Sequence, residues 1–481
     1  MIIGRAKEKE VLLDVLESRE SEMVAVIGRR RVGKTFLVRQ VYADLVDLEI
    51  TGIQHASMKE QIQSFTLALK KTFEWYDFPK TPTNWLAAFH LLANCLDSYQ
   101  KDGKIVVFLD ELPWFSTHKS GFITALGWFW NSWATRRNDV VLVICGSAAS
   151  WMIQKIVNDT GGLHNRITKR IFLMPFDLQE TEMYLKSRNI NLERYHILQL
   201  YMAFGGIPHY LKEVKAGKTA AQNIEAICLH PSGLLFKEFD RLYPALFEFS
   251  ENHIAIIRAL ASVNRGLNRR EIMEITGLLD GGGTSRFIDE LKMSGFISVF
   301  YPFESQKKEL YYRLTDEYSL FYLKFIENMQ ETGEDAWVKL SETQTYKVWS
   351  GYAFENICLK HTAQIKKALG IAGVYSQTSN YYKKGTKTEN GVQIDLLIDL
   401  LIDRNDKVIN LCELKFYNDV WTLTRKDREA ILEKIALFKS LTKTKKQIFF
   451  STIATFGIKQ NEYSLGCVDN AFPMDILFEK L

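Results

Sequence analysis

The stretch Gly28-Arg29-Arg30-Arg31-Val32-Gly33-Lys34-Thr35 decides the fold of the N-terminal part of this chain. It follows the strand-like run 22–26 and precedes the helical run 36–42, which is the strand, glycine-rich turn and helix order of a phosphate-binding loop. In that setting the backbone N–H groups surround a phosphate, Lys34 supplies positive charge and Thr35 offers a hydroxyl to Mg²⁺. We therefore predict that residues 28–35 bind a nucleotide with Mg²⁺, rather than forming only a structural turn.

Two further strand-like runs end in polar residues that suit the same site. The apolar run 105–109 ends in Asp110 and Glu111. The carboxyl ends of parallel strands meet at one edge of the sheet, where Asp110 can hold Mg²⁺ and Glu111 can activate the attacking water. The alternative is that both acids cap the next helix. Ser147 follows the run 140–145 and is either a sensor of the γ-phosphate or an ordinary turn serine.

Length and composition indicate a multidomain globular protein. The chain has 481 residues with 47% hydrophobic and 25% charged residues, which predicts roughly three domains. Its 61 Lys and Arg against 57 Asp and Glu give a net charge of +4, so any contact with nucleic acid must come from local patches. The N-terminus has no leader pattern, and no apolar run is long enough to span a bilayer. We expect a cytoplasmic protein with no membrane partner and with buried, reduced cysteines.

The pattern of elements predicts an α/β chain of several domains. Alternating strands and helices in the first part imply a parallel sheet covered by helices. Three short helices and two strands further on match a winged helix, and strand-like runs return in the last part at 393–398, 408–416 and 447–453. The predicted divisions are a P-loop core at 1–175, a helical lid at 176–240, a winged helix at 241–325, a connector at 326–340 and a mixed α/β domain at 341–481.

The third helix of the predicted winged helix, 284–294, would lie in a DNA major groove. It carries Arg286 and Lys292 but also Asp289 and Glu290, and acids repel phosphates. Cations on flanking elements could offset those acids: Arg265, Arg269, Arg270, Lys307 and Lys308. Both DNA binding and a protein-docking or structural role stay open.

In the last domain, Glu413 and Lys415 are two residues apart on a strand-like run and so project from one face. An acid and a lysine on one face of an apolar strand need partners, because burying unpaired charge is costly. Asp395 on the preceding strand can complete a carboxylate pair for Mg²⁺ or Mn²⁺, with Lys415 acting on the attacking water. The alternative is a structural salt bridge between Lys415 and the acids.

Several motifs together resemble the archaeal-type ATPase family of the AAA+/STAND group of P-loop proteins. They are Ile3-Gly4-Arg5-Ala6-Lys7-Glu8, the arginine-rich loop 28–35, Leu109-Asp110-Glu111, Cys145-Gly146-Ser147 and Gly205-Gly206-Ile207-Pro208. The resemblance covers about the first 320 residues and implies an ATPase with a lid and a winged helix. It also implies an arginine supplied by a neighbouring subunit of a homo-oligomer, for which Arg166 and Arg170 are both candidates.

The arrangement of Asp395, Glu413 and Lys415 resembles the PD-(D/E)xK nucleases, whose fold is restriction-endonuclease-like. Glu355, in Gly351-Tyr352-Ala353-Phe354-Glu355, matches the additional metal-binding acid of many such nucleases, and Gln393 shares a strand face with Asp395. The resemblance implies a metal-dependent DNase controlled by the ATPase, with DNA as the partner. A nuclease-like fold kept for binding, in a nucleotide-regulated scaffold that does no cleavage, is the alternative.

Overall fold

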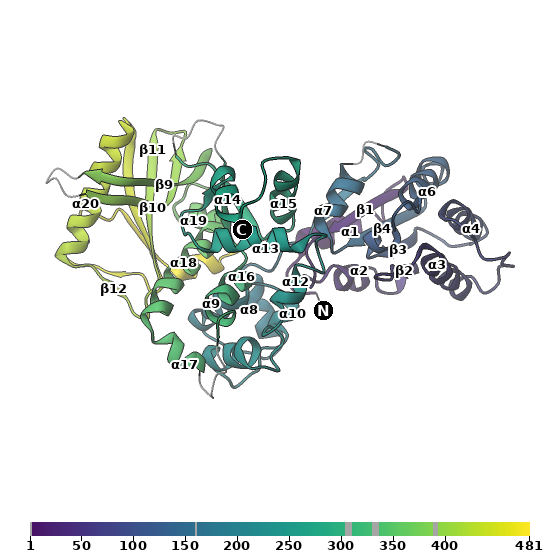
Figure 1. The fold of residues 1–481 in the computed structure, drawn as a ribbon, viewed down its shortest axis with the longest axis horizontal. Helices are drawn as coiled ribbons and strands as arrows, with labels where there is room; N and C mark the ends of the chain where they lie inside the picture. The colour runs from purple at the N-terminus through teal and green to yellow at the C-terminus, as the bar shows by residue number, and fades with distance from the viewer. Residues whose placement is uncertain (1, 159–160, 304–309, 330–335, 388–392) are drawn as a thin grey trace. The chain divides into compact units, whose positions relative to one another are not determined.

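The computed structural model describes residues 2–158, 161–303, 310–329, 336–387 and 393–481, and the side chains of 384–387 and 393–396 lie outside this description. The chain divides into two compact units (Figure 1). The first unit contains Met1–Pro175 with residues 246–248 and 289–295, and the second contains the rest. Each unit is described by itself.

A five-stranded parallel sheet forms the centre of the first unit, in the order β2-β3-β4-β1-β5. Its inner strands are continuous apolar runs, as expected for a parallel sheet buried on both faces. The phosphate-loop strand β1 pairs with β4, so β4 separates it from the acidic strand β3. The strands are β1 (Glu22–Ile27), β2 (Val46–Thr51), β3 (Ile105–Asp110), β4 (Val140–Gly146) and β5 (Lys169–Phe172).

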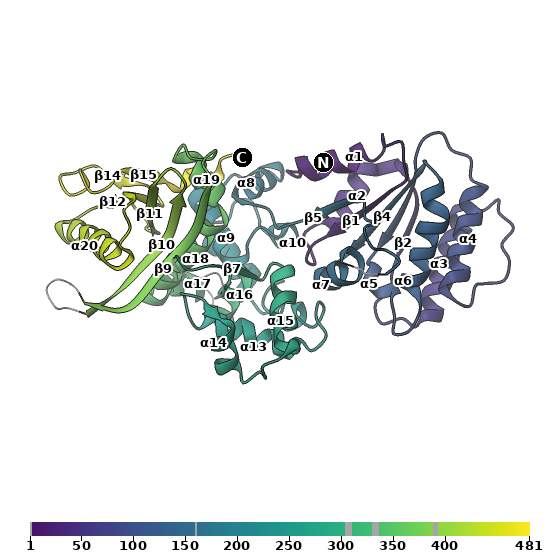
Figure 2. The same ribbon diagram turned by 90° about the horizontal axis from the view of Figure 1, so that it is seen from above.

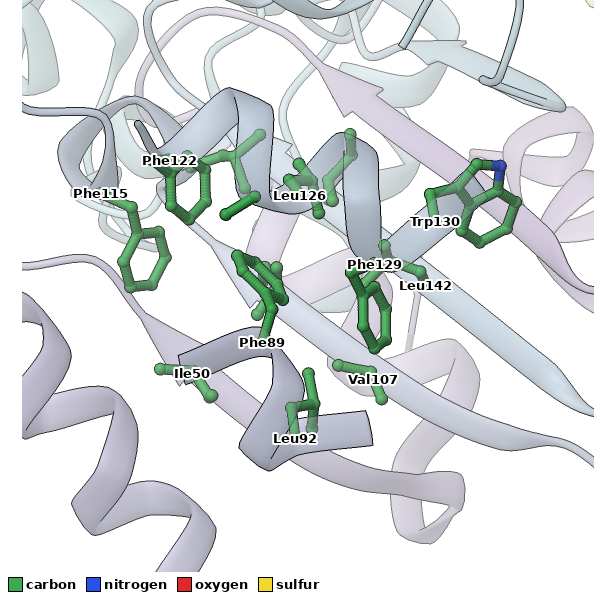
Figure 3. Close-up of a cluster of buried hydrophobic side chains, with 14 of the residues drawn as sticks. Ile50, Phe89, Leu92, Val107, Phe115, Phe122, Leu126, Phe129, Trp130 and Leu142 are labelled. Carbon is green, nitrogen blue, oxygen red and sulfur yellow. The ribbon is translucent and has the colours of Figure 1, made fainter. Parts of the chain in front are cut away.

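Helices cover this sheet and build a large aromatic core. One sheet face, which includes Ile50, Val107 and Leu142, packs against aromatic rings of the covering helices (Figure 3). Phe89 and Phe122 are two of these rings, with centroids 5.8 Å apart. The helices of the first unit are α1 (Ala6–Asp14), α2 (Lys34–Tyr42), η1 (Ala43–Leu45), α3 (Met58–Thr72), α4 (Trp85–Asp97), α5 (Leu112–Phe115), α6 (Phe122–Trp128), η2 (Phe129–Trp133), η3 (Ala134–Arg136), α7 (Ala149–Met152) and η4 (Ile153–Val157).

The second unit begins with short helices and continues into a small three-stranded sheet. The helices of residues 176–245 are α8 (Leu178–Ser187), α9 (Arg194–Phe204), α10 (Pro208–Leu211), α11 (Ala220–Ile224), η5 (Glu225–Leu229) and α12 (Phe239–Leu242). The three helices and two strands predicted for 251–314 are present. They are α13 (Ser250–Ala261), α14 (Arg269–Thr276), α15 (Gly282–Met293), β7 (Ile297–Phe300) and β8 (Tyr311–Leu314), and β6 (Leu267–Asn268) adds a strand in the order β6-β8-β7.

The last part of the second unit is a mixed five-stranded sheet in the order β15-β13-β11-β10-β9. Strands β9, β10 and β11 lie side by side and antiparallel, with α20 along one face (Figure 2), and β13 and β15 continue the sheet in parallel. The strands are β9 (Ser376–Lys387), β10 (Gln393–Arg404), β11 (Val408–Lys415), β12 (Trp421–Thr422), β13 (Gln447–Ala454), β14 (Ile458–Lys459) and β15 (Asn470–Pro473). The helices are α16 (Glu317–Phe321), η6 (Tyr322–Ile326), α17 (Ala336–Ser341), α18 (Gln344–Lys360), α19 (Thr362–Ala368), α20 (Arg425–Thr442) and η7 (Met474–Phe478).

Helices α8 and α9 pack against the last part of the chain, within the same unit. The backbone N–H of Leu178 donates to Nε2 of buried His361, 3.2 Å away. Arg194 forms an ion pair with Asp475 at 3.0 Å. Since these contacts join residues far apart in sequence, the segment predicted as a helical lid is structurally part of the unit that carries the C-terminal sheet.

Within the described residues, no helix combines the length and the apolar character that crossing a membrane requires.

Candidate nucleotide site and carboxylate cluster

The phosphate loop takes the shape that its two glycines allow. At Gly28 a Cβ atom would lie 2.4 Å from the carbonyl oxygen of Leu173, so a side chain does not fit there. Gly33 has φ +93°, in the left-handed region that favours glycine. Lys34 is buried, and its Nζ donates to the Arg29 carbonyl oxygen at 3.0 Å. The lysine is therefore held inside the loop, next to backbone groups that would face a phosphate.

The remaining loop side chains differ in burial. Val32 and Arg29 are buried, whereas Arg30 and Arg31 are partly buried. Arg31 has φ 73°, a conformation that a non-glycine residue adopts only where its surroundings impose it. The loop is thus built mainly by backbone conformation.

The two residues predicted to hold Mg²⁺ meet directly. Thr35 lies in the first turn of α2, and the buried Asp110 ends β3. The Thr35 hydroxyl donates to Asp110 Oδ2 at 2.8 Å. An oxygen pair of this kind, beside a phosphate loop, has the chemistry that Mg²⁺ prefers. The structure therefore brings Thr35 and Asp110 together as the sequence suggested.

Glu111 and Ser147 also meet, which the sequence did not reveal. The Ser147 backbone N–H and hydroxyl both donate to Glu111 Oε2, at 3.1 Å and 2.7 Å. Glu111 has φ 51°, and such strain in a non-glycine residue commonly accompanies functional sites. The partner of the Ser147 hydroxyl in this structure is thus the proposed water-activating carboxylate.

The two candidate arginines lie in and before β5, the strand beside the phosphate-loop strand β1. Both side chains are exposed. The Thr168 N–H, two residues after Arg166, donates to the Met23 carbonyl near the start of β1, whereas the loop follows the end of β1. Arg166 therefore lies toward the opposite end of the strand. Arg170 lies on β5 beside Ala25.

In the C-terminal sheet, Glu413 lies between two lysines. Its Oε1 is 2.8 Å from Nζ of Lys415, and its Oε2 is 2.5 Å from Nζ of Lys434 on α20. Burial raises the pKa of Glu413, but the charges of Lys434 and Lys415 outweigh it and lower the pKa below its usual value. Burial lowers the pKa of Lys415, and Glu413 raises it above the usual value. The predicted pair of Glu413 and Lys415 is present, with Lys434 as an additional partner.

The aspartate that the structure places beside Glu413 is Asp399. Leu400 pairs with Cys412, and the Asp399 carboxylate accepts a hydrogen bond from the Leu414 N–H at 3.1 Å. Burial, and then the charges of Glu413 and Glu355, raise the pKa of Asp399 to about 7. The side chain of Asp395, the aspartate chosen from the sequence, lies outside the described part of the structure, as does that of Gln393.

Glu355, predicted as a metal ligand, is held by an arginine. Arg313 on β8 donates from Nη1 to Glu355 Oε1 at 2.6 Å, and both side chains are nine-tenths buried. Over the described ranges, no group of three or more His, Cys, Asp and Glu side chains is placed to bind a metal ion. The predicted set of Asp395, Glu413 and Glu355 stays a prediction, because the side chain of Asp395 lies outside the described residues. Glu355 acts on Asp399 through its charge while its side chain contacts Arg313.

The cations expected to offset the acids of the α15 helix have acidic partners of their own. Arg265 pairs with Glu271 at 2.5 Å. Arg269 pairs with Asp280 at 2.6 Å, and Arg270 with Glu274 at 2.8 Å. Lys307 and Lys308 lie outside the described residues. Each of the three arginines thus has an acid beside it, and their contribution to DNA binding stays a prediction. On α15 itself, Arg286, Asp289 and Lys292 are exposed.

Three residues of these sites were missed from the sequence: Asp399, Lys434 and Arg313. The run Asp395-Leu396-Leu397-Ile398-Asp399 continues to Asp403, so aspartates recur at a fixed spacing. Only the pairing of β10 with β11 shows which of these aspartates lies beside Glu413. Lys434 and Arg313 lie on separate elements and carried no signal in the sequence.

Comparison with known proteins finds a family match for the N-terminal part. Residues 3–214 match the family model described as "ATPase domain predominantly from Archaea", so this part of the chain is similar to such ATPase domains. A protein of Methanocaldococcus jannaschii, described as "Uncharacterized protein MJECL04", is 22% identical over 420 residues. The alignment covers 86% of this chain and 88% of that protein.

Two solved structures are also similar. The Walker-type ATPase PABY2304 of Pyrococcus abyssi is 17% identical with a TM-score of 0.48, and the match covers 67% of this chain and 96% of that one. The ORC2 protein of Aeropyrum pernix is 16% identical with a TM-score of 0.40, covering 67% of this chain and 93% of that one.

Proposed function

We propose that this protein hydrolyses ATP and uses its nucleotide state to control DNA binding and metal-dependent phosphodiester cleavage in the C-terminal sheet. The observation that carries the cleavage proposal is the meeting of Asp399, Glu413 and Lys415 at neighbouring positions of β10 and β11. Two carboxylates with a lysine on adjacent strands are the groups needed to bind a divalent cation and to orient a water molecule.

At the phosphate loop, the chain's own residues divide the work. Residues 28–33 bind phosphate oxygens through backbone N–H groups, and Lys34 neutralises phosphate charge. The oxygens of Thr35 and Asp110, 2.8 Å apart, would hold Mg²⁺, which supplies further neutralisation when bound. Glu111 orients the attacking water, and the two hydrogen bonds from Ser147 fix its carboxylate.

At the C-terminal site, the donor chemistry fits a divalent cation. Asp399 and Glu413 offer oxygen ligands, and burial together with the charges of Glu413 and Glu355 raises the pKa of Asp399. Mg²⁺ or Mn²⁺ would supply the missing positive charge. Asp399 and Glu413 would hold the ion, and Lys415 would orient the attacking water. Asp395 stays the second candidate for the aspartate ligand. Glu355 is a candidate third ligand, but it could bind the ion only after its hydrogen bond to Arg313 breaks.

Helix α9 supports a physical connection between ATP hydrolysis and the proposed DNA cleavage. The family match ends at residue 214 and so includes α9. Tyr195 on α9 stacks on Phe416, with ring centroids 5.7 Å apart and planes 14° apart. Phe416 directly follows Lys415, so a displacement of α9 would be felt next to the proposed cleavage site.

DNA is the substrate that we propose. Its contacts would come from local cations, among them Arg286 and Lys292 on the exposed side of α15. A homo-oligomer would let Arg166 or Arg170 reach the nucleotide of a neighbouring subunit, because both side chains are exposed.

The second candidate is a nucleotide-regulated scaffold whose C-terminal sheet does no cleavage. The double ion pair of Glu413 with Lys415 and Lys434 favours it, because lysines that satisfy a carboxylate also make a stable structural network.

The deciding experiment incubates the protein with linear, circular and single-stranded DNA, with and without ATP and Mn²⁺. If the C-terminal sheet is a nuclease, we expect metal-dependent DNA cleavage. Glu413→Gln and Asp399→Asn should each abolish this cleavage and leave ATP hydrolysis unchanged. Asp395→Asn is the matched comparison, and loss of cleavage in that variant alone would move the site to Asp395. ATP-dependent retention of DNA without cleavage would select the scaffold.

A further inference from the structure

A cavity of about 490 Å³ lies in the second unit, away from the phosphate loop and on the Arg313–Glu355 side of the carboxylate cluster. It is formed by the end of α13, the strand β8, the α16–η6 segment and one side of α18. Its size falls within the range of sites that hold small organic ligands.

The cavity has two buried N–H groups without an acceptor. Arg313 and Trp349 line it and are each more than nine-tenths buried. Arg313 uses Nη1 for Glu355, but among the described residues its Nε has no hydrogen-bond partner, and neither has Trp349 Nε1. Both nitrogen atoms are themselves buried and are not open to the cavity. A buried donor left unsatisfied costs about 1–3 kcal/mol, so a ligand that draws either N–H group toward the cavity would gain that hydrogen bond.

The charges around the cavity favour an anion. Lys324 and Arg258 line it and are exposed, and Arg313 adds a third cation. The two lining carboxylates already have partners, since Glu327 pairs with Arg258 and Glu355 pairs with Arg313. One positive charge is left over, and guanidinium groups bind phosphate oxygens in pairs.

The rest of the lining suits a flat, polar ring system. Trp349 and Tyr352 contribute aromatic surface, and Leu260 and Leu320 contribute apolar surface. Asn264 and Asn356 add side-chain amides, which both donate and accept hydrogen bonds. Cationic groups, aromatic surface and amides in one small cavity are the features that bind a nucleotide.

We propose that this cavity is a second ligand site, separate from the phosphate loop, and that it binds a nucleoside monophosphate. Lys324 and Arg258 bind the phosphate at the entrance. On binding, the side chains of Arg313 and Trp349 turn so that Nε and Nε1 donate to acceptor atoms of the ligand, and the aromatic rings contact the base. Because Arg313 and Glu355 form part of the lining, the bound ligand lies beside the carboxylate that acts on Asp399.

The test measures binding of AMP, GMP, CMP and UMP by isothermal titration calorimetry, using full-length Lys34→Ala protein so that the phosphate loop contributes little. We expect saturable binding of at least one nucleotide at one site per chain. In the same background, Arg258→Ala with Lys324→Ala should weaken binding at least tenfold. Trp349→Phe keeps the ring, loses the N–H group and should weaken binding severalfold.

Arg270→Ala is the matched control, because Arg270 is an exposed arginine of the same unit that pairs with an acid but does not line the cavity. Its affinity should stay within twofold. Binding of inorganic phosphate and of ribose 5-phosphate is measured in the same way. If either one binds as tightly as the best nucleotide, the cavity does not recognise the base, and the proposal of a nucleotide is overturned. Absence of saturable nucleotide binding, or affinity unchanged in the Arg258/Lys324 variant, would overturn the site.

Discussion

Replacing Ser147 by alanine tests whether the Glu111 carboxylate is positioned by its neighbour. Two donors of Ser147 reach the same oxygen of Glu111, the hydroxyl at 2.7 Å and the backbone N–H at 3.1 Å. Ser147→Ala removes the shorter bond and keeps the longer one. A hydrogen bond to a charged group contributes about 1.5–3 kcal/mol. Because the backbone N–H still holds the carboxylate, we expect the loss of transition-state stabilisation to lie near the lower figure.

A loss of about 1.5 kcal/mol in transition-state stabilisation corresponds to roughly a tenfold lower rate. We therefore expect kcat for ATP hydrolysis to fall about tenfold, measured as phosphate release at saturating ATP. The Kd for a non-hydrolysable ATP analogue should change less than twofold, because Ser147 positions the acid and leaves phosphate binding to the loop.

Ser150→Ala supplies the control. Ser150 is buried close by in α7, and none of its hydrogen bonds in the described structure goes to Glu111. The reasoning is refuted if Ser147→Ala hydrolyses ATP at the wild-type rate, or if Ser150→Ala loses as much activity as Ser147→Ala.

Three further predictions concern other parts of the protein. Lys34→Ala should weaken ATP binding at least tenfold, whereas Glu111→Gln should bind ATP normally and hydrolyse it slowly; equilibrium binding and turnover assays separate the two, and full activity in Lys34→Ala would contradict the site. Arg166→Ala or Arg170→Ala should lower turnover more than ATP binding, and mixing with Lys34→Ala protein should restore activity if the arginine acts between subunits; unchanged turnover in both arginine variants would exclude that role. Burial lowers the pKa of His361 below its usual 6.5, so the unfolded chain takes up the proton first and thermal stability should fall as pH drops below about 6.5; an equally steep fall in His361→Gln would show that other groups cause it.

The first unit was predictable because its signals are local. Each inner strand of the parallel sheet is a continuous apolar run, and the functional residues follow directly at the strand ends. Lys34, Thr35 and Asp110 could therefore be identified from short stretches of sequence. The bond between Ser147 and Glu111 could not, because it depends on how two loops approach each other.

The C-terminal sheet was harder to predict because its pairings are long-range. Strand β9 has the polar sequence Ser-Gln-Thr-Ser-Asn-Tyr-Tyr over 376–382, which lacks the apolar pattern of a buried strand. Asp399 lies where the register of β10 against β9 shifts between Ile398 and Leu401. Such irregularities redirect side chains, and composition does not reveal them.

The Leu178–His361 and Tyr195–Phe416 contacts determine how the protein can be divided for experiment. The family match ends at residue 214, but the first compact unit ends its continuous part at Pro175. A protein shortened to residues 1–214 would keep α8 and α9 while losing the surfaces on which they pack. It would expose Tyr195 and leave the Leu178 N–H without its acceptor, which favours aggregation. If the shortened protein lost ATPase activity, the cause would be damage to α8 and α9 rather than the loss of a contribution from the C-terminal half. Point variants of the full-length chain keep these helices packed and therefore test that contribution directly.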